Sequence, residues 1–272
     1  MTGPGPLDWP PIALQFDPLQ GIDVKLAWAG KHIDELEKEI AYHMRGKGAY
    51  RIAHERQADG WFLGTFQLRH DPPIIPSIIF GEAIGQMRSS LDHLMVLMIR
   101  TNDPEGESEN FPICEKPADF FDARGKSTPS WADTLRRTLR PEHFELVKSV
   151  QPFKTKSATL PTIRRLNNLD KHELIHALYA GPRHISVPTD PNVAELDWLI
   201  DPTQRLYDRT QLYRVRYVDS TQVQVPMRVV IDVVIGPIDT YVRVDTLRTW
   251  LVQLQDIVQR VRDITPEFSR TS

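Results

Sequence analysis

Hydrophobic residues recur at helical spacing in several segments of the chain. Over residues 77–100 the apolar positions follow one another at steps of four and three, which is the spacing of one buried helix face. These positions are Phe80, Ile84, Met87, Leu91, Leu94 and Met98. A similar stripe predicts a last helix over residues 246–264, with Asp245 as its N-cap. Further helices are expected over residues 23–45, 130–139 and 141–150.

Alternating apolar and polar positions predict strands in two other regions. Residues 49–55 and 61–68 flank Ala58-Asp59-Gly60, and an Asp-Gly pair between alternating segments indicates a β-hairpin. Residues 184–240 also have strand character: Tyr213, Val215 and Tyr217 alternate, Asp219-Ser220 is a turn signal, and Pro226 indicates an edge or bulge. Residues 101–130 are expected to form an irregular connection. The chain is therefore predicted to be α+β, with a helical core of four to five helices, an N-terminal β-hairpin and C-terminal antiparallel strands.

The domain organisation follows from these elements. Residues 1–21 are rich in proline and glycine and are expected to form an extended arm. Residues 22–272 are expected to form a single α+β domain. Its helical core covers residues 22–182 with the hairpin at 49–68, and its β-rich part and final helix cover residues 183–268.

The composition indicates in which compartment of the cell the protein is expected. A single cysteine, Cys114, excludes internal disulfides and suits a reducing compartment. The first residues lack the basic and apolar regions of a signal peptide, and the most apolar stretch, residues 91–99, is too short to span a bilayer. We therefore expect a cytoplasmic protein that does not contact a membrane.

Charge is unevenly distributed along the chain. Residues 136–171 contain nine basic and three acidic side chains, a local charge of +6 in a chain whose net charge is −3. Such a cluster is most often a solvated surface, but it also indicates an anionic partner such as RNA or another phosphate-bearing ligand.

The candidate chemistry lies in the segment 162–179, which we predict to be one helix that ends at Gly181-Pro182. On a helical projection its apolar residues occupy one arc, and Arg165, His172 and His176 lie together on the opposite side. The histidines could equally make ordinary structural hydrogen bonds. Asp170 projects into the apolar arc, where it needs a partner such as Arg88.

Two chemical interpretations compete for this helix. His172-Glu173-Leu174-Ile175-His176 matches the HExxH pattern of zinc peptidases, in which the histidines bind zinc and the glutamate activates water. Glu195 would be the third ligand. Asp170 and Lys171, just before the first histidine, depart from the uncharged residues usual there. In this interpretation the cofactor is zinc, and otherwise none is expected.

The second interpretation is Arg-x4–6-His, the signature of HEPN-type ribonucleases, which act on the RNA backbone without a metal. Arg165 and His172 fit, and so do Arg88 and His93, although strings of this kind are common by chance. The seven-residue step places Arg165 and His172 on one helix face, whereas the five-residue step from Arg88 to His93 separates them by about 140°. Arg165 and His172 are the better pair.

Arg88 and Asp92 are spaced for an ion pair within one helix, and a structural salt bridge is the simpler interpretation of them. Cys114 has no histidine nearby in sequence and is expected to be a small buried residue.

The segment from Gly81 to His93, Phe111-Pro112-Ile113 and the segment from Leu166 to His172 together resemble a family of bacterial and phage proteins with RSxLDH and NNxDKH segments. The resemblance covers about a third of the chain. It implies that one set of residues acts together: Arg88, Asp92, His93, Asn168, Asp170, Lys171 and His172. In relatives an arginine usually follows the last histidine, so Glu173 departs from the pattern and the family does not share HExxH. No activity is established for the family, and such a set could also be a buried polar network that joins two helices.

Three functions follow as hypotheses. The first is a HEPN-like, metal-independent ribonuclease or RNA-binding protein that resembles toxin or defence effectors and acts as a homodimer. In it His172 is the general acid or base, Arg165 or Arg88 steadies phosphate charge, and Asn168 orients the phosphate. The second is a zinc-dependent hydrolase. The third is a non-enzymatic interaction protein in which the polar helix pair is structural.

Overall fold

The computed structural model describes residues 19–45, 49–70, 73–106, 110–125, 128–173, 178–186, 192–201, 206–218, 228–235 and 242–269. Side chains are described in these ranges except at residues 44–45, 172–173, 178–186, 228–235 and 269. Most of the predicted N-terminal arm therefore lies outside the described residues, as do Asp219-Ser220 and Pro226. Gln20 and Gly21, which the sequence placed in the arm, belong to the first helix.

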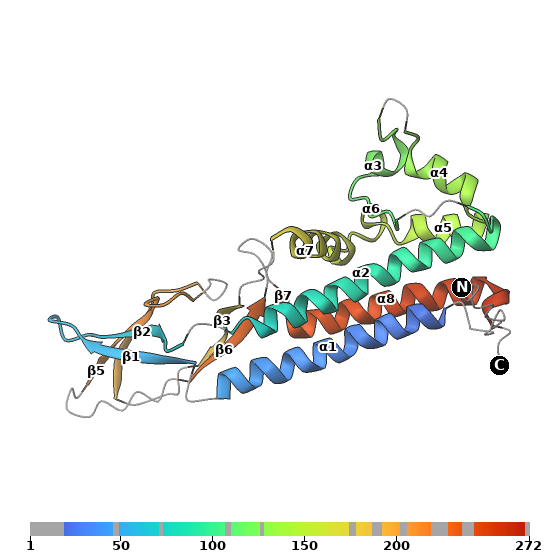
Figure 1. Ribbon diagram of the computed structural model, residues 1–272. Helices are drawn as coiled ribbons and strands as arrows, with labels where there is room; N and C mark the ends of the chain where they lie inside the picture. Colours follow the sequence, from blue (N-terminus) through green and yellow to red (C-terminus); the bar gives the residue numbers. More distant parts are fainter. Residues whose placement is uncertain are drawn as a thin grey trace, which may run out of the picture.

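Three long helices lie side by side and form the body of the molecule (Figure 1): α1 (Gln20–Arg45), α2 (Ile75–Asn102) and α8 (Val244–Ile264). Ion pairs show that α1 and α8 are antiparallel. Arg248, near the start of α8, bonds Asp34 and Glu37 in the second half of α1 at 2.8 and 2.6 Å. Arg262, near the end of α8, bonds Asp23 at the start of α1 at 2.7 Å.

The predicted stripe of α2 is confirmed, because all six of its apolar side chains are buried in the helical core. Most of the predicted stripe of α8 is buried as well. The predicted cap of α8 is wrong, however. The N-cap residue is Arg243, and Asp245 lies within the first turn, where its negative charge still favours the positive end of the helix.

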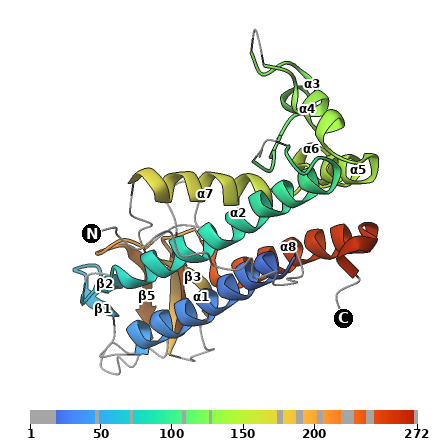
Figure 2. The same cartoon turned by 45° about the vertical axis from the view of Figure 1, so that its right-hand side comes forward.

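Helix α7 (Thr159–Glu173) lies on the side of α2 opposite α1 and α8 (Figure 2). Among the described residues, short helices gather near the end of α2: α3 (Pro117–Phe121), α4 (Trp131–Thr138), α5 (Pro141–Ser149) and α6 (Pro152–Thr155). The predictions of α4 and α5 are confirmed. α3 interrupts the stretch that was expected to be irregular, and α6 was not predicted. A 3-10 helix, η1 (Pro266–Ser269), follows α8.

A four-stranded antiparallel sheet lies beyond the other end of the bundle (Figure 1), in the order β1 (Tyr50–Arg56), β2 (Phe62–Leu68), β5 (Gln211–Tyr217), β4 (Val193–Trp198). The predicted hairpin is confirmed: Arg56 pairs with Phe62, and Gly60 takes the positive φ of +84° that the turn requires. The predicted alternation in β5 is confirmed too, because Tyr213, Val215 and Tyr217 are buried.

A second sheet consists of β3 (Leu178–Ser186), β6 (Arg228–Ile235) and β7 (Val242–Arg243). It corrects the predicted end of the candidate helix. Leu178 and Tyr179 are not helical but begin β3, where they pair with Ile235 and Val234. Gly181 and Pro182 do not stop a helix either, since they lie inside β3.

The α+β class with an N-terminal hairpin and C-terminal antiparallel strands is confirmed. Among the side chains that the structure describes, the buried apolar ones form two clusters, one among the helices and one within the four-stranded sheet. Within the described part of the chain, no helix has the length and apolar character to cross a membrane.

Candidate functional site

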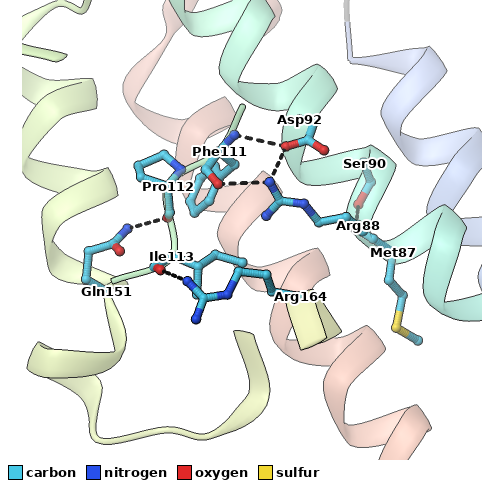
Figure 3. A network of polar contacts seen from close by, with 9 residues as sticks. All are labelled: Met87, Arg88, Ser90, Asp92, Phe111, Pro112, Ile113, Gln151 and Arg164. Carbon is cyan, nitrogen blue, oxygen red and sulfur yellow. Dashed lines mark hydrogen bonds and ion pairs between the residues drawn. The ribbon is translucent and has the colours of Figure 1, made fainter. Parts of the chain in front are cut away.

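The segments that the sequence singled out converge where α2 packs against α7. Between them runs an extended stretch, Phe111 to Cys114, which is buried but belongs to neither a helix nor a sheet (Figure 3). Its peptide groups therefore need hydrogen-bond partners from side chains. Four side chains supply them, and we call this set the clamp: Arg88, Asp92, Gln151 and Arg164.

Arg88 and Asp92 bind the first residue of this stretch. They form the expected ion pair, with 2.7 Å between Arg88 Nη2 and Asp92 Oδ1. Arg88 Nη2 also donates to the carbonyl of Phe111 at 3.1 Å, and the Phe111 amide donates to Asp92 Oδ1 at 2.9 Å. The pair thus engages both peptide groups of Phe111, as a neighbouring strand would (Figure 3).

Gln151 and Arg164 complete the clamp. The Gln151 carboxamide donates to the carbonyl of Pro112 at 3.0 Å and accepts from the amide of Cys114 at 2.9 Å. Arg164, on α7, donates to the carbonyl of Ile113 and to Glu115 Oε1, the latter at 2.7 Å. Residues from α2, α7 and the α5–α6 junction therefore fix one short stretch of backbone.

Burial shapes the electrostatics of the clamp. The Arg88 side chain is only 12% exposed. Burial lowers the pKa of Arg88, and the nearby charge of Arg164 lowers it further, whereas Asp92 raises it. Arg88 Nη1 is buried and has no hydrogen-bond partner among the described residues. Cys114 is buried, and its pKa is raised to about 11, chiefly by burial, so it is not an activated nucleophile.

His93 does not form a common site with Arg88. It is exposed, and its electrostatic neighbours include Lys25 on α1. Burial lowers the pKa of His93, Lys25 lowers it further and Asp92 opposes the change. The projection that separated Arg88 from His93 by about 140° is therefore consistent with the structure.

Helix α7 divides the other predicted residues between two sides. Ile163 and Leu166 are buried, whereas Arg165, Asn168 and Lys171 are exposed. We call these three the outer face of α7. His172 and Glu173 are the last residues of the helix, but their side chains lie outside the description, as does residue 176. The proposed alignment of Arg165, His172 and His176 is therefore described for Arg165 alone.

Asp170 lies against α2, but not in the pair that the sequence suggested. Arg88 is engaged by Asp92, and the Asp170 carboxylate instead packs on Gly81, where a Cβ atom would come within 2.4 Å of Asp170 Oδ1. A larger residue at position 81 would require the Asp170 carboxylate to move.

The zinc interpretation rests on side chains that are not described, except for Glu195. Glu195 lies on β4 and forms an ion pair with Arg216 at 3.2 Å. Among the described residues no three His, Cys, Asp or Glu side chains lie together as metal ligands would.

Sequence reasoning missed two members of the clamp. Gln151 carries no motif, and Arg164 was counted only as part of the basic segment. A glutamine just after a predicted helix and just before a proline is the local signal that could have pointed to Gln151.

Comparisons with models of protein families, with curated proteins and with solved structures found no match.

Proposed function

We propose that the protein binds RNA through its phosphate backbone, at the outer face of α7. The observation that carries the proposal is the exposure of Arg165, Asn168 and Lys171 at three-residue steps on a helix at the surface of the bundle. An arginine and a lysine supply positive charge, and the asparagine amide supplies hydrogen-bond donors, which is the chemistry of phosphate contacts.

The distribution of ion pairs supports this location. Among the basic side chains of residues 136–171, the following form ion pairs: Arg136 with Asp133, Arg140 with Glu267, Lys148 with Glu145 and Arg164 with Glu115. In contrast, Lys154, Lys156 and Lys171 are exposed and have no ion pair with a described residue. Of these three lysines, Lys171 lies on α7, Lys156 in the turn before it and Lys154 on α6.

The same proposal includes metal-independent cleavage, with His172 as the base. His172 takes the proton of a ribose 2′-hydroxyl, and the 2′-oxygen attacks the phosphorus. The 5′-oxygen then leaves with a proton from water, and Arg165 balances the charge on the phosphate while Asn168 orients it. Arg88 and Asp92 have no part in this step, because the clamp occupies them.

RNA binding is tested by fluorescence anisotropy with a labelled single-stranded RNA at several salt concentrations. We expect Arg165→Ala/Lys171→Ala to weaken binding about tenfold at low salt and to reduce the salt slope by about 1.4. Lys38→Ala/Arg100→Ala, which removes the same charge from exposed positions of α1 and α2, is the matched control. No binding by the unaltered protein, or an equal loss in both double variants, would contradict the proposal.

Cleavage is tested separately, with the same RNA in the presence of a chelator. We expect products that end in a 2′,3′-cyclic phosphate, lost in His172→Ala while binding persists. Cleavage that needs added zinc, with about one zinc per purified chain, would favour the HExxH hydrolase instead.

A second candidate function is a non-enzymatic interaction protein, and the clamp favours it. Arg88 and Asp92 are the charged residues of the RSxLDH segment. Both form hydrogen bonds with the backbone of Phe111, so their role is structural. The absence of RNA binding, RNA cleavage and bound zinc, together with a lowered melting temperature of His172→Ala, would favour this second candidate.

A further inference from the structure

A cavity of about 460 Å³ lies between α8 and the turn that joins α6 to α7. Its size falls within the range of small-molecule sites. It is separate from the clamp and from the outer face of α7, since none of their residues line it.

The lining combines an apolar floor with two polar walls. Leu160 and Ile257 are buried and contribute to the floor. Thr155 and Ser157 line the cavity from the turn, where their hydroxyls bond Gln151 and Thr159, and Gln253, Asp256 and Arg260 line it from α8. Gln253, Asp256 and Arg260 are exposed on α8 beside the buried apolar side chains, so the lining suits a ligand with both a flat apolar part and polar ends.

The polar groups of α8 have hydrogen-bonding capacity left for a ligand. Arg260 Nη2 donates to Ser149 Oγ at 2.9 Å, which orients the guanidinium and leaves other N–H donors. Gln253 and Asp256 form no hydrogen bond or ion pair with another described residue. Arg260 can therefore bind an anionic group of a ligand, and Asp256 can accept hydrogen bonds from N–H groups of the same ligand.

Their spacing along α8 sets the length of the ligand. At a rise of 1.5 Å per residue, Asp256 lies about 6 Å and Gln253 about 10 Å from Arg260 along the helix. A nucleotide carries an anionic phosphate at one end and a flat base with N–H donors and acceptors at the other. The distance between the two ends is comparable.

We propose that this cavity binds one nucleotide. Its phosphate is held by Arg260, its base lies over Leu160 and Ile257, and the edge of the base bonds Asp256 and Gln253. The hydroxyls of Thr155 and Ser157 face the ribose. The nucleotide is either free or part of an RNA chain, and the proposal does not rest on RNA binding at the outer face of α7.

The test uses the full-length protein with AMP, GMP, CMP and UMP, and in a second arm with a short single-stranded RNA. Hydrogen–deuterium exchange locates the site, and calorimetry measures affinity. We expect protection of residues 155–160 and 253–260. Arg260→Ala should lower the affinity about tenfold or more, whereas Arg100→Ala, at another exposed helix position, should not change it.

Asp256→Asn should alter the preference among the four bases, because it replaces an acceptor-only group with one that also donates. Mononucleotide binding identifies a free ligand. Protection by the RNA alone, lost in Arg260→Ala, identifies a nucleotide within a chain. Arg165→Ala/Lys171→Ala should keep mononucleotide binding, so this site and the α7 site can fail independently. Neither arm protecting the cavity, an unchanged affinity in Arg260→Ala, or equal protection by phenylalanine would overturn the proposal.

Discussion

At the scale of single residues, the buried stretch from Phe111 to Cys114 explains why Arg88 and Asp92 are held inside the molecule. Backbone groups buried outside regular structure cost free energy unless they are hydrogen-bonded. Asp92 accepts from the Phe111 amide and Arg88 donates to the Phe111 carbonyl. The pair thereby replaces the ladder that a sheet would provide.

Removing Asp92 should therefore destabilise the protein strongly. Asp92→Ala leaves the Phe111 amide unsatisfied and Arg88 buried without its counter-ion. We expect a loss of about 2–4 kcal/mol in the free energy of unfolding, measured by urea denaturation. Glu195→Ala breaks the exposed pair with Arg216 and should cost less than about 1 kcal/mol. Similar losses in the two variants would show that the clamp contributes no more than a surface ion pair.

The rate at which the Cys114 thiol reacts measures how firmly the clamp residues hold the stretch from Phe111 to Cys114. With its pKa raised to about 11, only about a thousandth of the thiol is ionised at pH 8, and burial hinders access to it. We expect iodoacetamide to modify Cys114 in the native protein far more slowly than in urea. Asp92→Ala should raise the native rate, because it frees the neighbouring backbone. A rapid reaction in the unaltered protein would contradict the burial of this thiol.

The sequence predicts contacts between residues that are close in the chain, but not contacts between residues that are far apart in it. The i, i+4 spacing was enough to predict that Arg88 pairs with Asp92. No pattern links Asp92 to Phe111, or Gln151 to Pro112, because these contacts depend on how helices far apart in sequence come together. The same holds for Asp170, whose carboxylate packs on Gly81.

At the scale of elements, periodicity predicted α2 and the hairpin well and failed at the end of α7. The α2 stripe is long and unbroken, so the pattern had a single interpretation. Residues 162–179 also fit a helix, but Leu178 and Tyr179 pair with β6. Pro182, taken as a helix stop, lies in β3 beside a shift in register between Pro182 and His184. Proline has no amide to donate, and such an irregularity accommodates it within a sheet.

The packing of α2 against α7 makes opposite predictions for two glycines of α2. A Cβ atom at Gly81 would lie 2.4 Å from Asp170 Oδ1, whereas a Cβ atom at Gly85 would meet nothing within 4 Å. We expect Gly81→Ala to lower the free energy of unfolding by about 1–2 kcal/mol, because the Asp170 carboxylate must leave its position against α2. Gly85→Ala should raise it by about 0.5–1 kcal/mol, because alanine favours the helix. Urea melts measure both, and stabilisation by Gly81→Ala would show that Asp170 moves aside without cost.

At the scale of the whole molecule, the four-stranded sheet joins two distant parts of the sequence. β2 pairs with β5, although more than a hundred residues separate them. The strands themselves could be predicted from alternation, but their partners could not, since no local signal encodes a pairing at this distance. The apolar cluster of the sheet is also distinct from that of the helices.

Two apolar clusters raise the question of whether the sheet and the bundle unfold together. Phe66 is fully buried in the sheet cluster, so Phe66→Ala should cost about 3–5 kcal/mol locally. If each cluster stabilises its own elements, native-state hydrogen exchange in this variant should accelerate in β1, β2 and β5 and stay unchanged in α1, α2 and α8. Leu91→Ala, which removes a buried side chain of the helical cluster, should give the reverse pattern. Equal acceleration throughout in both variants would instead show that the four-stranded sheet and the helices unfold as one cooperative unit.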